Sequence, residues 1–255
     1  MLKIRIIPVL LLKNNRMVKP INFGEKGERD VGFPVTTARI YDSQGADELV
    51  FLDITATEDG RNFLLDTLSG VARDCFVPLT VGGGIRSIEA INDLLSSGAD
   101  KVAINTYAVE NPSFITEAAN KFGGQCIVVS IDVKKNDRGI YEVFINQGKK
   151  ATGLDAVEWA KKVEKLGAGE ILLTSIDREG MMVGYDLDLI KIISEAVSIP
   201  VIANGGAGTR QHFADAIKIA NASAVAASSI FHFSDSNLSQ VKSFLNNSGI
   251  SVRPI

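Results

Sequence analysis

Short, almost continuous apolar segments recur along the chain at fairly even spacing. Most are runs of valine, isoleucine, leucine and alanine rather than alternating apolar and polar residues, which is typical of parallel strands covered on both faces. The eight segments occupy residues 4–12, 48–53, 77–82, 101–104, 126–132, 170–175, 199–203 and 222–228.

Amphipathic stretches with helical spacing lie between these segments. Ser87 and the pair Asn111–Pro112 give two of them helix-starting signals. Eight strand–helix units in one chain predict a (β/α)8 TIM barrel that forms a single domain over residues 1–255. The alternative, an open doubly wound sheet, would not naturally use eight evenly spaced units. The helical stretches cover residues 63–72, 88–96, 111–121, 156–166, 188–196 and 211–219.

The two halves of the chain resemble each other. GADELVFLDIT at 45–55 matches GAGEILLTSID at 167–177, and VPLTVGGGIRS at 77–87 matches IPVIANGGAGT at 199–209. GADKVAIN at 98–105 matches NASAVAAS at 221–228 more loosely. Because the three matches keep the same order and a spacing of 122–123 residues, we expect a barrel built from two duplicated half-barrels.

Composition restricts the possible functions. The chain is 45% hydrophobic and 22% charged with a formal net charge of −3, so no basic excess indicates a nucleic acid or an anionic membrane as partner. No apolar run is long enough to cross a bilayer and no leader pattern is present, which favours a cytoplasmic protein. Cys75 and Cys126 lie in apolar contexts and are expected to be buried free thiols.

Two glycine-rich turns occupy equivalent positions, at residues 82–84 and 205–208. Glycine allows backbone N–H groups to approach an anion, and barrels of this class commonly bind phosphate on such loops. The segments near 103–106 and 228 end the next strand of each half. Tight strand–helix turns are the simpler explanation for one cluster, but two equivalent clusters favour a ligand with a phosphate at each end.

Four acids are expected at the carboxyl ends of strands, where active sites of these barrels lie: Asp53, Asp132, Asp177 and Glu179. A carboxylate there suits general acid–base work. The alternative is an incidental ion pair, with Lys134 or Lys135 for Asp132 and with Arg178 for Asp177. We favour the functional interpretation for Asp132 and leave both open for Asp177.

The first strand differs from its duplicate at one position. Superposing RIIPVLLLKN on CIVVSIDVKK places Leu11 on Asp132. Leucine can neither accept nor donate a proton. A register shift would not restore an acid, because residues 1–23 contain none.

The motifs DELVFLDITAT, TVGGGI, ADKVAINT, GAGEILLTSIDREG, NGGAG and FHF together resemble the HisF family, the cyclase subunit of imidazole glycerol phosphate synthase, over essentially the whole chain. A sister barrel, the phosphoribosyl-formimino isomerase of histidine biosynthesis, shares the duplication but lacks two of these motifs, and it too would want an acid at position 11. The resemblance implies a lyase that takes ammonia from a glutaminase partner of the HisH type. Such a lyase would convert the bis-phosphate PRFAR and ammonia into imidazole glycerol phosphate and AICAR, with no metal and no cofactor.

The resemblance also assigns residues. It implies catalytic roles at Asp132 and at position 11, where Leu11 replaces the family's aspartate, and a mobile-loop role for Lys19; Glu179 stands where aspartate is usual. It places an ammonia gate of Arg5, Glu48, Lys101 and Glu170 at the strand starts, with Asp100 and Gln125 near the docking face of the glutaminase. The phosphate contacts that it implies are Gly83, Gly84, Asn105 and Thr106 at one end and Gly180, Gly206 and Ser228 at the other.

Loss of a proton-transferring group typically costs ~10²–10⁴-fold in rate. We therefore expect weakened or absent cyclase activity. A subset of the family resembles the chain in having LL in place of the acid, and its members are thought to pass ammonia to a separate amidotransferase that makes acetamidino sugars of surface polysaccharides. That role is the alternative function.

Overall fold

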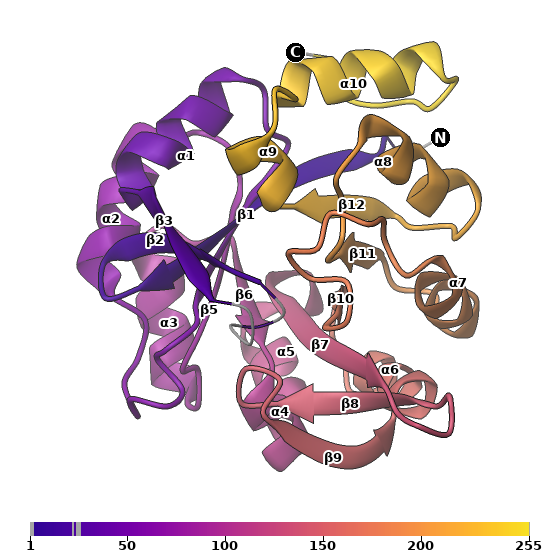
Figure 1. The fold of residues 1–255 in the computed structure, drawn as a ribbon. Helices are drawn as coiled ribbons and strands as arrows, with labels where there is room; N and C mark the ends of the chain where they lie inside the picture. The colour runs from indigo at the N-terminus through magenta and orange to yellow at the C-terminus, as the bar shows by residue number, and fades with distance from the viewer. Residues whose placement is uncertain (1–2, 22, 24–26, 255) are drawn as a thin grey trace.

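The computed structural model describes residues 3–21, 23 and 27–254, and Figure 1 shows them as a closed barrel surrounded by helices. Eight parallel strands form the barrel in the order β1-β4-β5-β6-β7-β10-β11-β12, and β12 pairs again with β1. The predicted (β/α)8 architecture is confirmed. The barrel strands are β1 (Arg5–Lys13), β4 (Leu49–Asp53), β5 (Leu79–Gly82), β6 (Lys101–Ile104), β7 (Ile127–Lys135), β10 (Glu170–Ser175), β11 (Val201–Asn204) and β12 (Ala224–Ala227).

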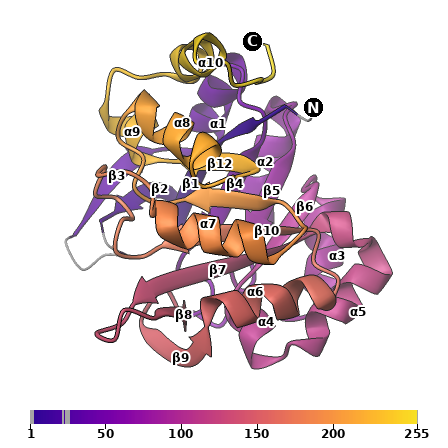
Figure 2. The ribbon, with the colours of Figure 1, turned by 90° about the vertical axis from the view of Figure 1, so that its right-hand side faces the viewer.

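The ten α-helices of the described ranges include all six that were expected. Their buried side chains belong to one large apolar cluster with the outward-facing side chains of the strands. Figure 2 shows α6, α7 and α8 on one side of the barrel. The helices are α1 (Pro34–Ser43), α2 (Leu65–Asp74), α3 (Ile88–Ser96), α4 (Thr106–Glu110), α5 (Ser113–Phe122), α6 (Ala156–Lys165), α7 (Leu187–Ala196), α8 (Arg210–Lys218), α9 (Ser229–Phe233) and α10 (Leu238–Asn247).

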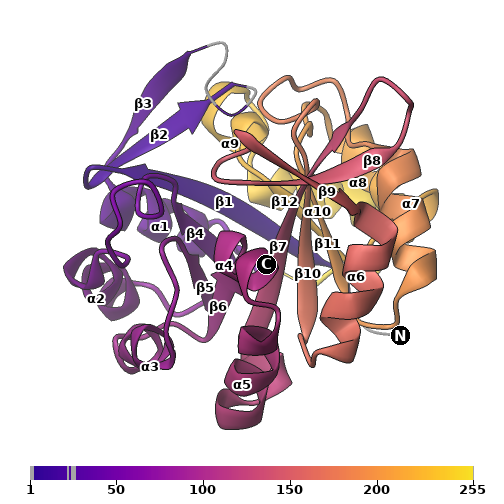
Figure 3. The same cartoon turned by 90° about the horizontal axis from the view of Figure 1, so that it is seen from below.

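Each half of the chain adds an antiparallel hairpin to the end of its first strand. In the first half, β2 (Arg16–Pro20) pairs with β1 and with β3 (Glu28–Gly32). In the second, β8 (Tyr141–Ile145) pairs with β7 and with β9 (Lys150–Asp155). Figure 3 shows both hairpins at the same end of the barrel, the end at which the barrel strands finish.

A second, smaller apolar cluster fills the inside of the barrel. It contains inward-facing residues from most of the barrel strands, in the layered arrangement expected for this fold. Its fully buried members include Ile7, Val50, Val128, Leu172, Ile202 and Ala224.

Both cysteines are free thiols, but only Cys75 is buried as expected. Cys126 is half-buried because it ends a short 3₁₀ turn, Gly124–Cys126, before β7 begins. The apolar residues that follow Cys126 in the sequence belong to β7, whereas Cys126 itself precedes that strand. Across the described ranges, none of the helices is both long enough and apolar enough to cross a membrane.

Candidate active site at the barrel mouth

Strand pairing confirms the alignment of the two halves at the barrel mouth. Leu11 lies beside Leu52 in the β1–β4 register, and Asp132 lies beside Thr174 in the β7–β10 register. Leu52 and Thr174 are themselves equivalent in the sequence repeat. Leu11 and Asp132 therefore occupy equivalent positions on strands four places apart in an eight-stranded barrel, on opposite sides of the mouth.

Leu11 and Asp132 both line a cavity of about 140 Å³ at the mouth. Its Leu11 side is apolar, with Val9 and Leu52 beside the leucine, and its opposite side is polar, with Ser130 and Thr174 beside the aspartate. One side of the mouth can therefore transfer protons, while the equivalent position on the other side can only exclude water.

Asp132 is buried, and its Oδ2 accepts a hydrogen bond from Asn105 Nδ2 at 2.7 Å. Burial raises the pKa of Asp132 to about 7, against the opposing effect of hydrogen bonds from Asn105 and Thr174. A carboxyl group that titrates near neutrality can act as donor or acceptor. This arrangement supports the acid–base interpretation of Asp132 over an incidental lysine pair.

The other expected acids have different surroundings. Asp53 is buried, but Arg61 donates to both of its oxygens, at 2.6 and 3.1 Å, so it holds the loop after β4. Asp177 is exposed and accepts the backbone N–H of Lys135 at 3.2 Å. Asp177 is not among the residues that line the mouth cavity, whereas Glu179 is.

Lys19 lies on β2 rather than in a loop, and it is only 2% exposed. Its ammonium group donates to Glu179 Oε1. Burial lowers the pKa of Lys19 to about 7. The nearby His232, whose Nδ1 is 2.9 Å from the Tyr41 hydroxyl, has its pKa lowered to about 4 by burial and by the charge of Lys19, so its imidazole is neutral at pH 7.

The residues assigned to phosphate fall into two groups, one for each half. Gly83, Gly84, Asn105 and Thr106 line the mouth cavity. Gly180, Gly206 and Ser228 line a smaller cavity together with Lys19 and Glu179. We call these groups the first and second cradles. Asn105 and Ser228 are equivalent in the repeat and share a backbone conformation, with φ −121° and −127°.

The glycines of both cradles are required by backbone packing. A Cβ on Gly84 would lie 2.1 Å from the carbonyl oxygen of Arg61, and one on Gly206 would lie 2.2 Å from that of Gly184. Both glycines have positive φ, +69° and +104°. The tight-turn explanation therefore accounts for these glycines without any ligand, and phosphate binding stays a prediction.

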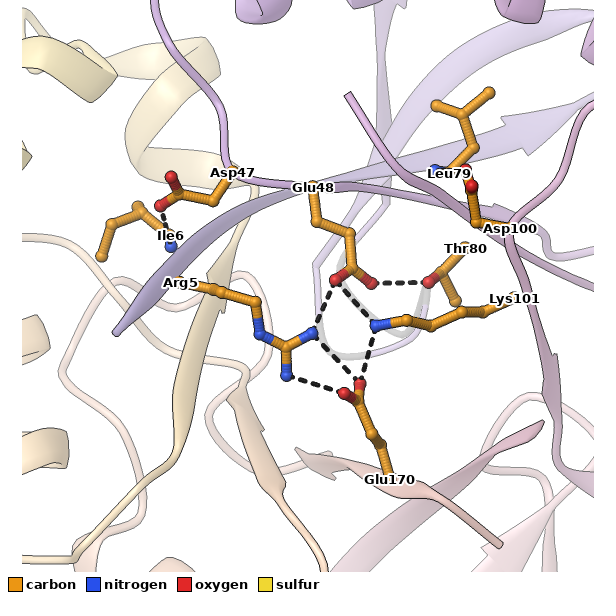
Figure 4. Close-up of polar contacts among 9 residues, drawn as sticks. All are labelled: Arg5, Ile6, Asp47, Glu48, Leu79, Thr80, Asp100, Lys101 and Glu170. Carbon is orange, nitrogen blue, oxygen red and sulfur yellow. Dashed lines mark hydrogen bonds and ion pairs between the residues drawn. The ribbon is translucent and has the colours of Figure 1, made fainter. Parts of the chain in front are cut away.

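A ring of four charged side chains closes the other end of the barrel (Figure 4). Arg5 contacts Glu48 at 2.6 Å and Glu170 at 3.0 Å, while Lys101 contacts the same two acids at 3.0 and 3.1 Å. Thr80 donates to Glu48 at 2.6 Å. Every charge in the ring thus has two opposite charges beside it, which offsets part of the cost of burial.

Asp100, just before β6, and Gln125, in the 3₁₀ turn before β7, are both exposed, and their place near a docking face stays a prediction. Asp100 Oδ2 also accepts the Leu79 backbone N–H at 2.8 Å, so it fixes the start of β5. Sequence reasoning missed Arg61, Thr174 and Tyr41. None of the three had a signal in the sequence, since it is the β7–β10 register that places Thr174 beside Asp132.

The fold and site define a (β/α)8 barrel of duplicated halves with a carboxyl group at its mouth and a charged ring at its base. A family model described as "Histidine biosynthesis protein" matches residues 5–237. The chain belongs to this family, which includes the HisF and HisA barrels.

Proposed function

We propose that this chain is a HisF-type subunit that receives ammonia from a glutaminase at the charged ring and delivers it to the mouth, with its own cyclase step weakened or lost. The observation that carries the proposal is the contrast between the two ends of the barrel. All four residues of the ring are present and in contact, whereas the mouth has a leucine where its duplicate half has an acid.

The inside of the barrel suits the passage of a small neutral molecule. Above the ring lie fully buried aliphatic residues, including Ile7, Val50 and Leu172. An apolar lining strongly disfavours an ion but costs a neutral molecule little. Ammonia rather than ammonium would therefore travel through it, after a side chain of the closed ring swings aside.

At the mouth, Asp132 would handle one proton of the lyase and cyclase steps on PRFAR. The family's second proton-handling position is occupied by Leu11, whose neighbours Val9 and Leu52 are also apolar. With one general acid–base group absent, turnover of PRFAR is expected to fall by ~10²–10⁴-fold.

The alternative is that ammonia leaves the mouth for a separate amidotransferase that makes acetamidino sugars. The retained ring and the missing acid favour this role, because ammonia conduction needs no proton-transferring group at position 11. Under this alternative the chain would act as a conducting partner with no reaction on PRFAR.

The test combines the purified chain with a HisH-type glutaminase. The proposal predicts that the rate of glutamine hydrolysis by the glutaminase rises when the chain is added. It also predicts that the double variant Arg5→Ala, Lys101→Ala changes the size of this stimulation. A Lys161→Ala variant, in an exposed ion pair on α6, serves as the matched control. A chain that neither binds nor stimulates the glutaminase would contradict the proposal.

A further inference from the structure

The second cradle is occupied by an ion pair that belongs to the protein itself. Lys19 and Glu179 line the same small cavity as Gly180, Gly206 and Ser228, and the Lys19 ammonium contacts Glu179 Oε1. The two side chains are 2% and 11% exposed. The positive charge available in this cradle is thus already engaged by a negative one.

The other oxygen of Glu179 faces the glycine loop of the cradle. Glu179 Oε2 lies 3.3 Å from the point where a Cβ on Gly205 would stand. A phosphate bound to this loop would sit beside the carboxylate, and like charges at such distances repel strongly when they are shielded from water. Glu179 therefore stands where an incoming anion needs to be.

The first cradle is free of this obstruction. The repeat pairs Glu179 with Thr57, an uncharged residue that lines the mouth cavity. Arg86, the counterpart of Gly208, also lines that cavity and adds a positive charge. Of the acids there, Asp53 is neutralised by Arg61, and burial raises the pKa of Asp132 to about 7. The two cradles are thus alike in backbone, but the second has a carboxylate where the first has a neutral threonine, and the first has an arginine where the second has a glycine.

The second cradle nevertheless retains an unused donor. The Ser228 hydroxyl is buried, lines the small cavity and has no hydrogen-bond partner, and Ser228 is 8% exposed. An unsatisfied buried hydroxyl is costly. It indicates an acceptor that Glu179 does not supply and a ligand oxygen could.

We propose that the Glu179 carboxylate is an internal anion that competes with a ligand phosphate for Lys19 in the second cradle. A ligand with one phosphate, seated in the first cradle, then binds with the Lys19–Glu179 pair intact, whereas a bis-phosphate must displace it. Glu179 thereby sets the preference of the mouth toward ligands with a single phosphate. This inference rests on the proposed function only in assigning phosphates to the two cradles.

Titration with inorganic phosphate, followed at the backbone amides of Gly84 and Gly206 by NMR, tests the inference cradle by cradle. In the parent, the Gly84 amide should respond at lower phosphate concentration than that of Gly206. Glu179→Gln should tighten binding at Gly206 by about tenfold or more and leave Gly84 unchanged. The reciprocal variant, Thr57→Glu, should weaken binding at Gly84.

Two further variants keep the test decisive. Glu179→Asp retains the charge on a shorter side chain and should give a smaller gain at Gly206, so it replaces Glu179→Gln if that protein does not fold. Lys19→Met should remove binding at Gly206 from the parent and from Glu179→Gln alike. If a folded variant of position 179 binds phosphate at Gly206 no more tightly than the parent does, the inference is overturned. The proposed function would remain intact. A parent that shows no response at Gly84 would overturn the assignment of phosphate to the cradles, and the inference with it.

Discussion

Leu11 and Asp132 are structural equivalents on opposite sides of the barrel mouth. Leu11 lies beside Leu52, and Asp132 lies beside Thr174. The sequence repeat pairs Leu52 with Thr174. The backbone repeats the relationship: Ile54 N donates to Leu12 O, and Ile176 N donates to Val133 O. The difference between the two sides of the mouth is therefore one of chemistry, at matching places in the same scaffold.

Asp132→Asn should remove a pH dependence of stability. Because burial raises the pKa of Asp132 to about 7, the folded state binds an extra proton between the aspartate's ordinary pKa and about 7. The free energy of unfolding of the parent should therefore fall as pH rises from about 4 to about 7, by at most about 4 kcal/mol. The asparagine variant, which can still accept from Asn105, should lack this fall. Denaturant unfolding at several pH values measures it, and parallel curves for the two proteins would contradict the assigned burial effect.

Among the residues of the charged ring, truncation of the most buried one should lower the free energy of unfolding the most. Glu48→Ala removes a side chain that is 2% exposed and accepts from Arg5, Lys101 and Thr80. It should lower the free energy of unfolding by about 3–5 kcal/mol, because two buried cations lose a partner. Glu170→Ala, at 14% side-chain exposure, should cost less. Thermal or urea unfolding of both variants is the measurement, and equal losses would show that burial of Glu48 does not decide its contribution.

Substitution of a cradle glycine should destabilise the protein even without a ligand. Gly84→Ala places a Cβ against the carbonyl oxygen of Arg61 in a left-handed backbone conformation, so we expect a loss of about 2–3 kcal/mol or more. Gly60→Ala is the matched control, since its φ is +63° but nothing lies within 4 Å of the added Cβ; strain alone should cost about 1 kcal/mol. Similar losses for both would remove the steric explanation of Gly84.

Much of the fold was predictable because the spacing of hydrophobic residues and the internal sequence repeat indicate its strands and helices. The eight continuous apolar runs identify the barrel strands, and helix 88–96 was predicted with the bounds that the structure shows. The two hairpins after β1 and β7 were not expected, since residues 16–20 and 150–155 lack a clear alternating pattern. The first helix, Pro34–Ser43, was also missed, because its apolar side chains are not confined to one face: Ala38 and Tyr41 are buried, whereas Ile40 is 47% exposed.

The site was predictable only where the repeat gave a comparison. The repeat identified position 11 as the counterpart of Asp132, and strand register confirms it. Side-chain pairing across the barrel left no such mark in the sequence. The contact of Lys19 with Glu179 joins residues 160 positions apart that only the closed fold brings together. The contact of Arg61 with Asp53 spans only eight positions and depends on how the loop after β4 folds back.

Ammonia-dependent turnover of PRFAR, measured for the parent beside a Leu11→Asp variant, tests the central claim most directly. The account predicts turnover by the parent that is absent or weak, and a rise of ~10²–10⁴-fold on restoring the acid opposite Asp132. Leu11→Asn, which has a similar shape and cannot transfer a proton in this way, should show no rise. A parent that already turns over PRFAR as fast as the Leu11→Asp variant would contradict the claim that the leucine removes the cyclase step.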